Sequence, residues 1–351
     1  MTIPTPGLGY RARRTARVVL PALSAFAASI LLTACGSAGS PANSITLYNG
    51  QHEQTTALLV AAFEKETGIK VQVRSADEAT LGNQILQEQG NSPADVFFTE
   101  NTPVLELLRE HRLLATVPAS TLSAVPSRYD SAQGAWVGVS ARVSALVYNP
   151  SKLGGAKPPT TLLALASPEW RHKVGFAPSE TDFQPLVTAI EKLDGRAAAE
   201  SWLNGLKAGG KIYPDNETVV AQVNNGQSAI GPIDHYYWYR LHVEEGASGT
   251  HSALAYYAPG DPGDLVDVSG AAVLASSSHK AAAQRFLAFL VSEKGQRVLA
   301  ASDSFEYPIR PGVAPHARLR PLSSFRPNSL TPAELGDGRE PLEMEQRLGL
   351  L

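Results

Sequence analysis

Short extended segments alternate with helical segments from residue 45 to residue 110, and this order restricts the fold more than any other feature. We expect strands at residues 45–49, 69–73 and 93–98, and helices at residues 55–66, 81–89 and 103–110. Gly68 follows the first helix, where a left-handed residue is common, and Pro103 suits a first helical turn. Because strands and helices take turns, this part of the chain predicts a mostly parallel, wound sheet.

The remaining chain continues the α/β pattern. We expect extended pieces at residues 136–149, strands at 174–177 and 227–231, and an extended segment at 265–274. The helices are expected at residues 183–193, 197–207, 281–300 and 340–348, with another beginning at Tyr236. The second of the two pieces in 136–149 crosses into a second lobe, and 265–274 returns to the first. A Gly/Pro-rich loop, at residues 152–159, separates the two regions.

The N-terminus predicts export and a lipid anchor. Four arginines precede an apolar stretch at residues 18–32, which is too short and interrupted for a good membrane span. It ends in Leu32-Thr33-Ala34-Cys35, which is typical of a bacterial lipoprotein signal with Cys35 as the acylated first residue. An ordinary signal peptide with a chance cysteine is the alternative, and Arg13-Arg14 leaves twin-arginine export open beside the general route.

Processing at Cys35 would leave an acidic protein on the outer face of the cytoplasmic membrane. Residues 1–35 form the signal peptide and residues 36–44 a flexible tether. The signal contains four arginines and no acids, so the mature chain has 26 basic and 33 acidic residues and a formal charge of −7. An acidic surface does not favour nucleic acid and suits cations. Cys35 is the one cysteine of the chain, so the mature fold has no internal disulfide.

Two neighbouring tyrosines, Tyr236 and Tyr237, suggest a metal site. A phenol has a pKa near 10, so only a strongly charged, hard cation displaces its proton at neutral pH, and ferric iron is the obvious candidate. The pair begins a helix, whose positive end favours a phenolate. On the run 234–239 alone, an aromatic cluster packed in a core or an interface is the plainer interpretation.

Two further candidate ligands follow strands of the first lobe. His52 comes shortly after the first strand and Glu100 after the third. In wound sheets, ligands bind outside the carboxyl ends of the strands, so the two side chains are expected at one edge. Each alone is more often a solvated loop residue, and it is the pairing that favours a site.

A tethered, extracytoplasmic chain with two lobes and crossing strands describes a bacterial substrate-binding protein, which closes about a hinge. We therefore expect a two-lobed α/β fold, similar to the periplasmic binding proteins, with the ligand cleft between the lobes. The first lobe would comprise residues 45–143 plus 268–318, and the second residues 144–267 plus 319–351. A monomer is expected.

From residue 45 to residue 313 the chain resembles the ferric-iron-binding proteins of bacterial ABC transporters, the bacterial transferrins. Six runs carry the resemblance: 48–52, 63–71, 93–100, 236–239, 269–274 and 306–310. In that family a His and a Glu from one lobe and two tyrosines from the other hold Fe(III). The resemblance implies these roles for His52, Glu100, Tyr236 and Tyr237.

The same family often adds a synergistic anion, carbonate or phosphate, and water. Here the chain departs from the pattern, because the anion loop reads Ser179-Glu180-Thr181-Asp182 and Asp234 replaces a frequent Asn. The residues expected near the anion, or behind the ligands, are Asn101, Arg142, Thr181, Asp182, Asn216 and Asp234. Added carboxylates repel phosphate. We expect a weak anion, carbonate held by Arg142, or its replacement by water or Asp182, unless both aspartates face solvent or cap helices.

The resemblance implies delivery of iron to a membrane permease driven by an ATPase. One alternative keeps the fold and changes the ligand to an oxyanion, polyamine or organic acid, with the tyrosines as packing. Catalysis is not expected, because His52-Glu53 lacks the second histidine of a zinc-protease motif at Thr56. Ser277 and Lys280 fit a Ser-x-x-Lys pattern, but the Lys-Thr-Gly motif that accompanies this pattern in enzymes is missing. A structural or adhesive lipoprotein would not predict ligands at strand ends.

Overall fold

A computed structural model describes residues 43–351. The described residues form one compact unit. The predicted signal peptide, Cys35 and tether residues 36–42 lie outside the described residues. Within the described chain, no helix combines the length and apolarity needed to cross a membrane.

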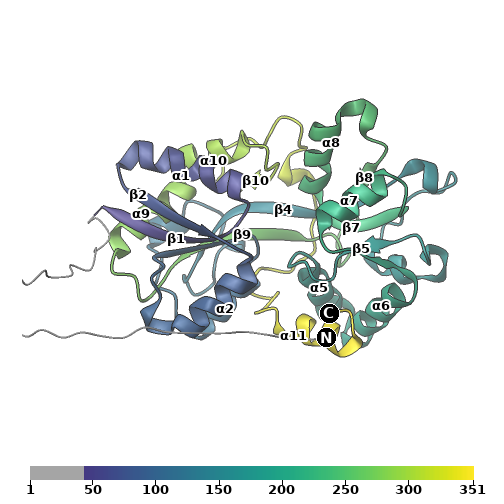
Figure 1. Cartoon of the computed structure of the whole chain (residues 1–351), viewed down its shortest axis with the longest axis horizontal. Helices are drawn as coiled ribbons and strands as arrows, with labels where there is room; N and C mark the ends of the chain where they lie inside the picture. The colour runs from purple at the N-terminus through teal and green to yellow at the C-terminus, as the bar shows by residue number, and fades with distance from the viewer. Residues whose placement is uncertain (1–42) are drawn as a thin grey trace, which may run out of the picture. The chain divides into compact units, whose positions relative to one another are not determined.

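The first three strand–helix pairs are confirmed (Figure 1). They are β1 (Ser44–Gly50), α1 (Glu53–Thr67), β2 (Lys70–Ser75), α2 (Glu78–Glu88), β3 (Val96–Thr99) and α3 (Pro103–Glu110). β1 lies between β2 and β3 and is parallel to both. Gly68 ends α1 in the left-handed region, with φ 70°, as its position predicted. The carboxyl ends of β1 and β3 therefore lie side by side at the same end of their strands.

The sheet as a whole is mixed: the parallel arrangement predicted from residues 45–110 holds for β1, β2 and β3 but does not extend to the other strands. Its main path is β10-β4-β9-β3-β1-β2, completed by β4 (Val137–Tyr148), β9 (Val266–Val273) and β10 (Tyr307–Pro308). β9 pairs antiparallel with both β3 and β4 because it enters the sheet from the opposite direction. Residues 137–148 form one strand with an irregularity between Gly138 and Ser140, rather than the two extended pieces expected.

β4 also reaches into the second group of elements, where its last residues pair with β7 (Ile230–Asp234) and β8 (Ala253–Ala255). β5 (Gly175–Phe176) and β6 (Lys211–Ile212) form a separate parallel pair. The helices here are α5 (Phe183–Asp194), α6 (Arg196–Gly209), α7 (Asn216–Asn224) and α8 (His235–Gly249). α7, β6 and β8 were not predicted. β7 begins three residues later than expected and contains Pro232, a residue that argues against a strand in a sequence.

The expected helix at 281–300 is two helices, α9 (Lys280–Leu290) and α10 (Glu293–Ala300). Ser292 separates them, and its Oγ accepts the Gly295 N–H at 3.1 Å as an N-cap. α11 (Arg339–Leu348) confirms the predicted C-terminal helix. Short α4 (Ala119–Leu122) and single 3-10 turns complete the chain, at Gln89–Asn91, Ser127–Tyr129, Pro150–Lys152, Leu162–Ala166, Pro168–Trp170 and Leu322–Ser324.

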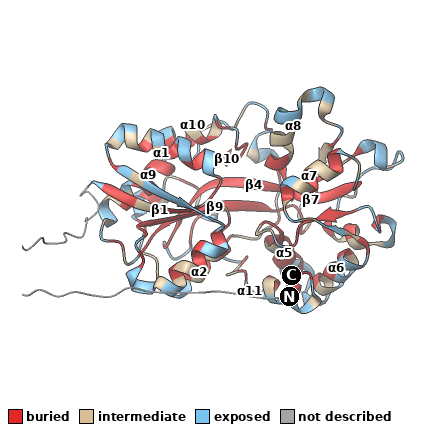
Figure 2. Ribbon diagram, viewed as in Figure 1, coloured by how far each residue is buried: buried red, intermediate tan, exposed pale blue. Residues whose placement is uncertain are grey.

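Burial is concentrated on the strands that join the two groups (Figure 2). Every residue of β9, and all of β4 except its last, is buried. One hydrophobic cluster packs Phe63 and Val96 of the first group together with Tyr236 and Tyr237 of α8. A second cluster joins Phe183 and Trp202 to α11. Polar and charged side chains are also buried along β4, and they lead to the candidate site.

Candidate metal centre

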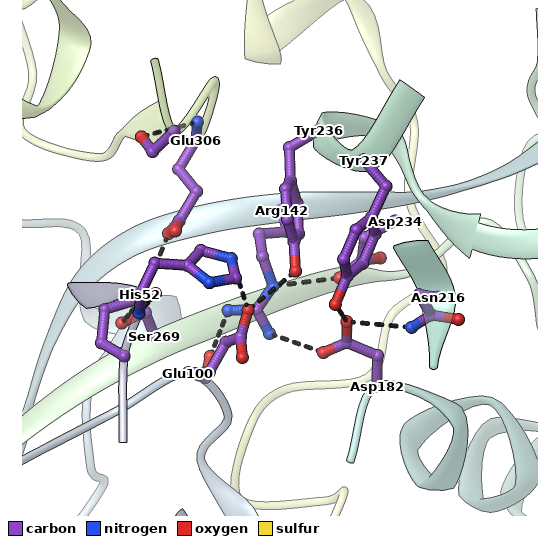
Figure 3. Close-up of polar contacts among 12 residues, drawn as sticks. His52, Glu100, Arg142, Asp182, Asn216, Asp234, Tyr236, Tyr237, Ser269 and Glu306 are labelled. Atoms are coloured by element: carbon purple, nitrogen blue, oxygen red, sulfur yellow. Dashed lines mark hydrogen bonds and ion pairs between the residues drawn. The ribbon is translucent and has the colours of Figure 1, made fainter. Parts of the chain in front are cut away.

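His52 and Glu100 lie together beyond the carboxyl ends of β1 and β3, as their sequence positions predicted (Figure 3). His52 is the N-cap of α1, and Glu100 directly follows β3. Nε2 of His52 lies 2.9 Å from Oε1 of Glu100, and the two form an ion pair. Parallel pairing of β1 with β3 places these strand ends side by side, so local sheet geometry brings together residues that are 48 positions apart.

Tyr236 and Tyr237 lie in the first turn of α8, and in Figure 3 the Tyr236 side chain points toward Glu100 and the Tyr237 side chain toward Asp182. Their ring centroids are 4.0 Å apart. The Tyr236 hydroxyl donates to Oε1 of Glu100 at 2.7 Å, and the Tyr237 hydroxyl donates to Oδ2 of Asp182 at 3.0 Å. Both tyrosines are buried, and the Tyr236 ring also lies edge-on to His52. The structure therefore brings all four predicted ligands into one cluster.

Charge and burial set the protonation of this cluster. Burial, followed by the charge of Glu100, raises the pKa of Tyr236 well above its usual range; burial and Asp182 do the same for Tyr237. Burial alone would raise the pKa of Glu100, but His52 and Arg142 outweigh it and bring the pKa to about 2. Burial opposes a charged His52, yet the Glu100 carboxylate raises its pKa overall. Both phenols are therefore neutral donors in the metal-free protein.

Arg142, on β4, lies beneath the cluster and is fully buried. Its Nε donates to Oδ2 of Asp234 at 3.0 Å, and the other guanidinium nitrogens donate to the Glu100 carbonyl and to Oδ1 of Asn101. Asp182 lies 3.5 Å away as a second ion-pair partner. Each of the three nitrogens thus contacts a protein acceptor.

The remaining predicted residues also lie here. Asn101 donates to Oδ1 of Asp182 at 3.0 Å and to the Thr181 hydroxyl at 3.1 Å, while Asn216 donates to Oδ2 of Asp182 at 3.5 Å. Asp182 and Asp234 are 5% and 1% exposed, and neither side chain caps its helix. The alternative that both aspartates face solvent or cap helices is therefore wrong.

Several buried polar residues at the site were not predicted. Glu78 of α2 accepts hydrogen bonds from the Glu100 and Asn101 backbone, and burial followed by Glu100 raises its pKa to about 8. Glu306 accepts the Ser140 hydroxyl and, at 3.4 Å, the amide of Gln51. His235 accepts the Val143 N–H and is held neutral by burial, with its pKa near 3. In the sequence, an acid such as Glu78 in a first helical turn is indistinguishable from a surface acid.

The donor set suits a hard trivalent cation. Among the described residues, no group of three or more His, Cys, Asp or Glu side chains is placed to hold a metal. Nε2 of His52 is buried and, apart from its ion pair with Glu100, has no hydrogen-bond partner among the described residues. A cavity of about 170 Å³, lined by His52, Arg240 and Ser302 among others, lies beside it. Phenolate, carboxylate and imidazole together match the preference of Fe(III) for oxygen and nitrogen donors.

Comparison with known proteins agrees with the two-lobed fold. The model of the bacterial extracellular solute-binding protein family matches residues 59–320. The "Fe(3+)-binding periplasmic protein" of Serratia marcescens is 38% identical over 93% of this chain and 96% of its own. The "Major ferric iron-binding protein" of Neisseria meningitidis serogroup B is also 38% identical, over 91% of this chain and 97% of its own.

Among solved structures, iron-bound HitA from Pseudomonas aeruginosa is 42% identical and superimposes with a TM-score of 0.84. The match covers 87% of this chain and 99% of that chain. The neighbours share the two-lobed mixed α/β fold that the sequence predicted. On its match over most of its length and its two-lobed fold, the chain belongs to the family of bacterial extracellular solute-binding proteins.

Proposed function

We propose that this protein is an extracytoplasmic receptor for ferric iron, with Fe(III) as its cargo. The observation that supports this most directly is the convergence of two buried phenols with His52 and Glu100 in one cluster. In this proposal Fe(III) replaces the phenol protons and the Tyr236–Glu100 hydrogen bond, and His52, Glu100, Tyr236 and Tyr237 become its ligands. The names of relatives similar over nearly the whole chain support the same cargo.

We further propose that Asp182 takes the place of an external anion. Its carboxylate precedes α5 and already faces Tyr237, Asn101 and Arg142. Carbonate bound to Arg142 is less favoured than this arrangement, because the guanidinium is engaged by protein acceptors. Phosphate would meet the charges of Asp182 and Asp234 at close range and is disfavoured more strongly.

Iron affinity measured with and without phosphate tests the role of Asp182. We expect no large gain from phosphate in the native protein and a gain in Asp182→Asn, which removes a charge and keeps the shape. A strong phosphate dependence of the native protein would contradict the proposal.

The proposed mechanism is the closure of two lobes about a hinge. One lobe comprises residues 45–143 plus 268–318, and the other comprises residues 144–267 plus 319–351. β4 and β9 are the crossing strands, and hinge motion about them would separate His52 and Glu100 from the two tyrosines. The hydrogen bonds of Tyr236 to Glu100 and of Asn101 to Asp182 span the proposed boundary. We propose that iron meets one set of ligands first and that closure adds the other.

The closed, loaded protein would dock on the permease of an ABC importer, whose ATPase drives uptake. Membership in the solute-binding family supports this partner class. We also propose anchoring through a lipid on Cys35, which keeps the monomeric receptor on the outer face of the cytoplasmic membrane. Binding without turnover is sufficient for this role, so no catalytic residues are assigned.

Visible absorption of the iron-stripped mature protein during titration with ferric citrate tests the cargo. A coloured phenolate-to-iron band that saturates at one iron per protein, and weakens in Tyr236→Phe and in Tyr237→Phe, is expected. Tyr148→Phe is a matched control, because Tyr148 ends β4 and takes no part in the cluster. If no band develops in a folded protein, the tyrosines are packing residues, and an oxyanion, polyamine or organic acid becomes the favoured ligand.

A further inference from the structure

Glu78 supports the turn that carries Glu100 without being a candidate ligand itself. It lies in the first turn of α2 and is 4% exposed. Its Oε2 accepts the backbone N–H of Glu100 at 2.8 Å and that of Asn101 at 2.9 Å, and its Oε1 accepts the Asn101 side-chain amide at 3.1 Å. Three donors from the turn after β3 thus converge on one carboxylate. Because the Glu100 N–H is fixed, the starting point of its side chain is fixed as well.

The backbone of β1 is shaped to admit Glu78. A Cβ atom on Gly50 would lie 2.5 Å from the Cβ of Glu78 and 2.8 Å from its Cα, closer than real side chains approach. Only glycine at the last position of β1 lets α2 begin so near the sheet. Gly50 is two residues before His52. The turn that leads from β1 to His52 and the turn that carries Glu100 therefore both lie against Glu78.

Glu78 also directs a contact toward the second lobe. The Asn101 amide that donates to Glu78 donates to Oδ1 of Asp182 at 3.0 Å and to the Thr181 hydroxyl at 3.1 Å as well. Asp182 in turn accepts the Tyr237 hydroxyl at 3.0 Å. Continuous hydrogen bonds therefore run from Glu78 to a ligand of each lobe. Because Glu78 fixes the orientation of the Asn101 amide group, it also determines how the amide hydrogens are directed toward Asp182 and Thr181.

We propose that Glu78 is a positioning residue of the iron site, which holds Glu100 in place and directs Asn101 to Asp182 across the cleft. This inference rests on the proposed function, because it takes Glu100 as an iron ligand. Loss of an outer hydrogen-bond partner of a metal ligand typically weakens metal binding about 10–100-fold. We expect a loss of that size when the Glu78 carboxylate is removed, although no atom of Glu78 would touch iron.

The test compares Glu78→Ala and Glu78→Gln with Glu88→Gln, using ferric nitrilotriacetate as the iron source. Glu88 is a matched control, because it lies at the other end of α2 and accepts hydrogen bonds from Tyr48 and Ser92. We expect Glu78→Ala to raise the Kd about 10–100-fold and to move the maximum of the phenolate band. Glu78→Gln keeps one acceptor oxygen and should recover part of the affinity. Glu88→Gln should leave both quantities unchanged.

A second variant reaches the same contact from the other side. Gly50→Ala leaves Glu78 in the chain but forces it away from the turn, so it should reproduce the band shift of Glu78→Ala. Unfolding midpoints identify the variants that fold, and Glu78→Gln and Gly50→Ala carry the test if Glu78→Ala does not. Folded variants with the native Kd and the native band would overturn the proposal.

A readout on iron-free protein separates this inference from the proposed function. Amide hydrogen exchange at Glu100 and Asn101 should quicken in Glu78→Ala and stay native in Glu88→Gln, because Glu78 accepts both of those N–H groups. If native protein fails to bind iron, the proposed function falls, and this exchange still decides whether Glu78 holds the turn. Unchanged exchange at both amides would overturn the positioning role.

Discussion

Arg142 compensates several buried acids at once. It is fully buried and pairs with Asp234 at 3.0 Å and with Asp182 at 3.5 Å. Burial opposes its charge, but Asp182 and Asp234 raise its pKa well above the usual value. Burial, followed by the charges of Asp182 and Asp267, raises the pKa of Asp234, and Arg142 opposes this shift. Removing one partner of such a pair leaves a buried charge without compensation, which costs about 3–5 kcal/mol.

Arg142→Met should therefore lower the free energy of unfolding by about 3–5 kcal/mol, measured by urea denaturation at neutral pH. Methionine fills similar space without the charge, so the loss reflects compensation of the acids. Arg297→Met is the control: Arg297 pairs with Glu293 on the surface, where water screens the charges, and little change is expected. Equal losses in the two variants would contradict this account.

Iron binding should release two protons from Tyr236 and Tyr237. Both phenols have raised pKa values and are neutral before binding. Affinity for free Fe(III) should then fall about 100-fold for each unit of decrease in pH, and more steeply below the pKa of His52. Calorimetry in two buffers of different ionisation enthalpy counts the protons. Tyr237→Phe should release one fewer, and an unchanged count would rule out this phenol as a source.

The candidate ligands could be named from local patterns together with the family resemblance. His52 and Glu100 follow strands. The adjacent phenols suggested a hard metal, although packing was the plainer interpretation of residues 234–239 alone. No local pattern in the sequence showed which acidic side chains are buried. Asp182 and Asp234 look in the sequence like capping or solvated acids, and only tertiary packing places them against Arg142. Glu78 was missed for the same reason, since its partners are backbone groups of a distant turn.

α11 contains a carboxyl group whose charged form is disfavoured by burial. Glu345 is fully buried, neither of its oxygens has a hydrogen-bond partner among the described residues, and burial raises its pKa to about 8. The folded state therefore holds a proton that the unfolded chain has lost above about pH 4.5. Between these two pKa values the unfolded state binds fewer protons, so stability falls as pH rises.

We expect the free energy of unfolding to fall through this group by up to about 1.4 kcal/mol per pH unit between about pH 4.5 and 8. Glu345→Gln removes the titration, so it should flatten that part of the stability curve and stabilise the protein at pH 8. Glu343→Gln, two residues away on the same helix, is the control, because Glu343 is exposed. A native slope in Glu345→Gln would mean that the carboxylate is solvated.

Helix and strand positions followed from periodicity, and the errors lie where single contacts decided the outcome. The apolar pattern of residues 281–300 continues through Ser292, but the Ser292 side chain caps α10 and divides the helix. Gly295 lets the turn close, because a Cβ there would lie 2.2 Å from the Phe289 carbonyl. Neither effect changes the hydrophobic period, so the sequence pattern did not reveal the break.

For the molecule as a whole, iron should act as a clamp between its two halves. Ligands that bind only the folded state stabilise it by about 2.7 kcal/mol at a concentration 100 times the Kd. Stripping iron with a chelator should therefore lower the thermal midpoint, and re-adding Fe(III) should restore it. The double variant Tyr236→Phe, Tyr237→Phe should show a much smaller shift. Equal midpoints with and without iron in the native protein would exclude binding between the lobes.

The two-lobed architecture was predictable from the alternation of elements and the exchange of strands, but the strand directions were not. Local sequence determines that residues 266–273 are extended. β9 runs antiparallel to its neighbours β3 and β4. Its direction depends on where the chain returns from the second lobe, and that is a property of the complete fold. The sheet is mixed for this reason, although its first three strands are parallel as predicted.

The strand order also decides when this protein can fold. β3, at residues 96–99, borders β9, at residues 266–273, and β4 borders β10, at residues 307–308. A chain that is made from its N-terminus cannot complete the central sheet until nearly all of it has been synthesised. Pairings so distant in sequence also form slowly, because a long loop must close first. The topology thus delays completion of the central sheet until late in synthesis, and β3 and β4 lack their final strand partners until then.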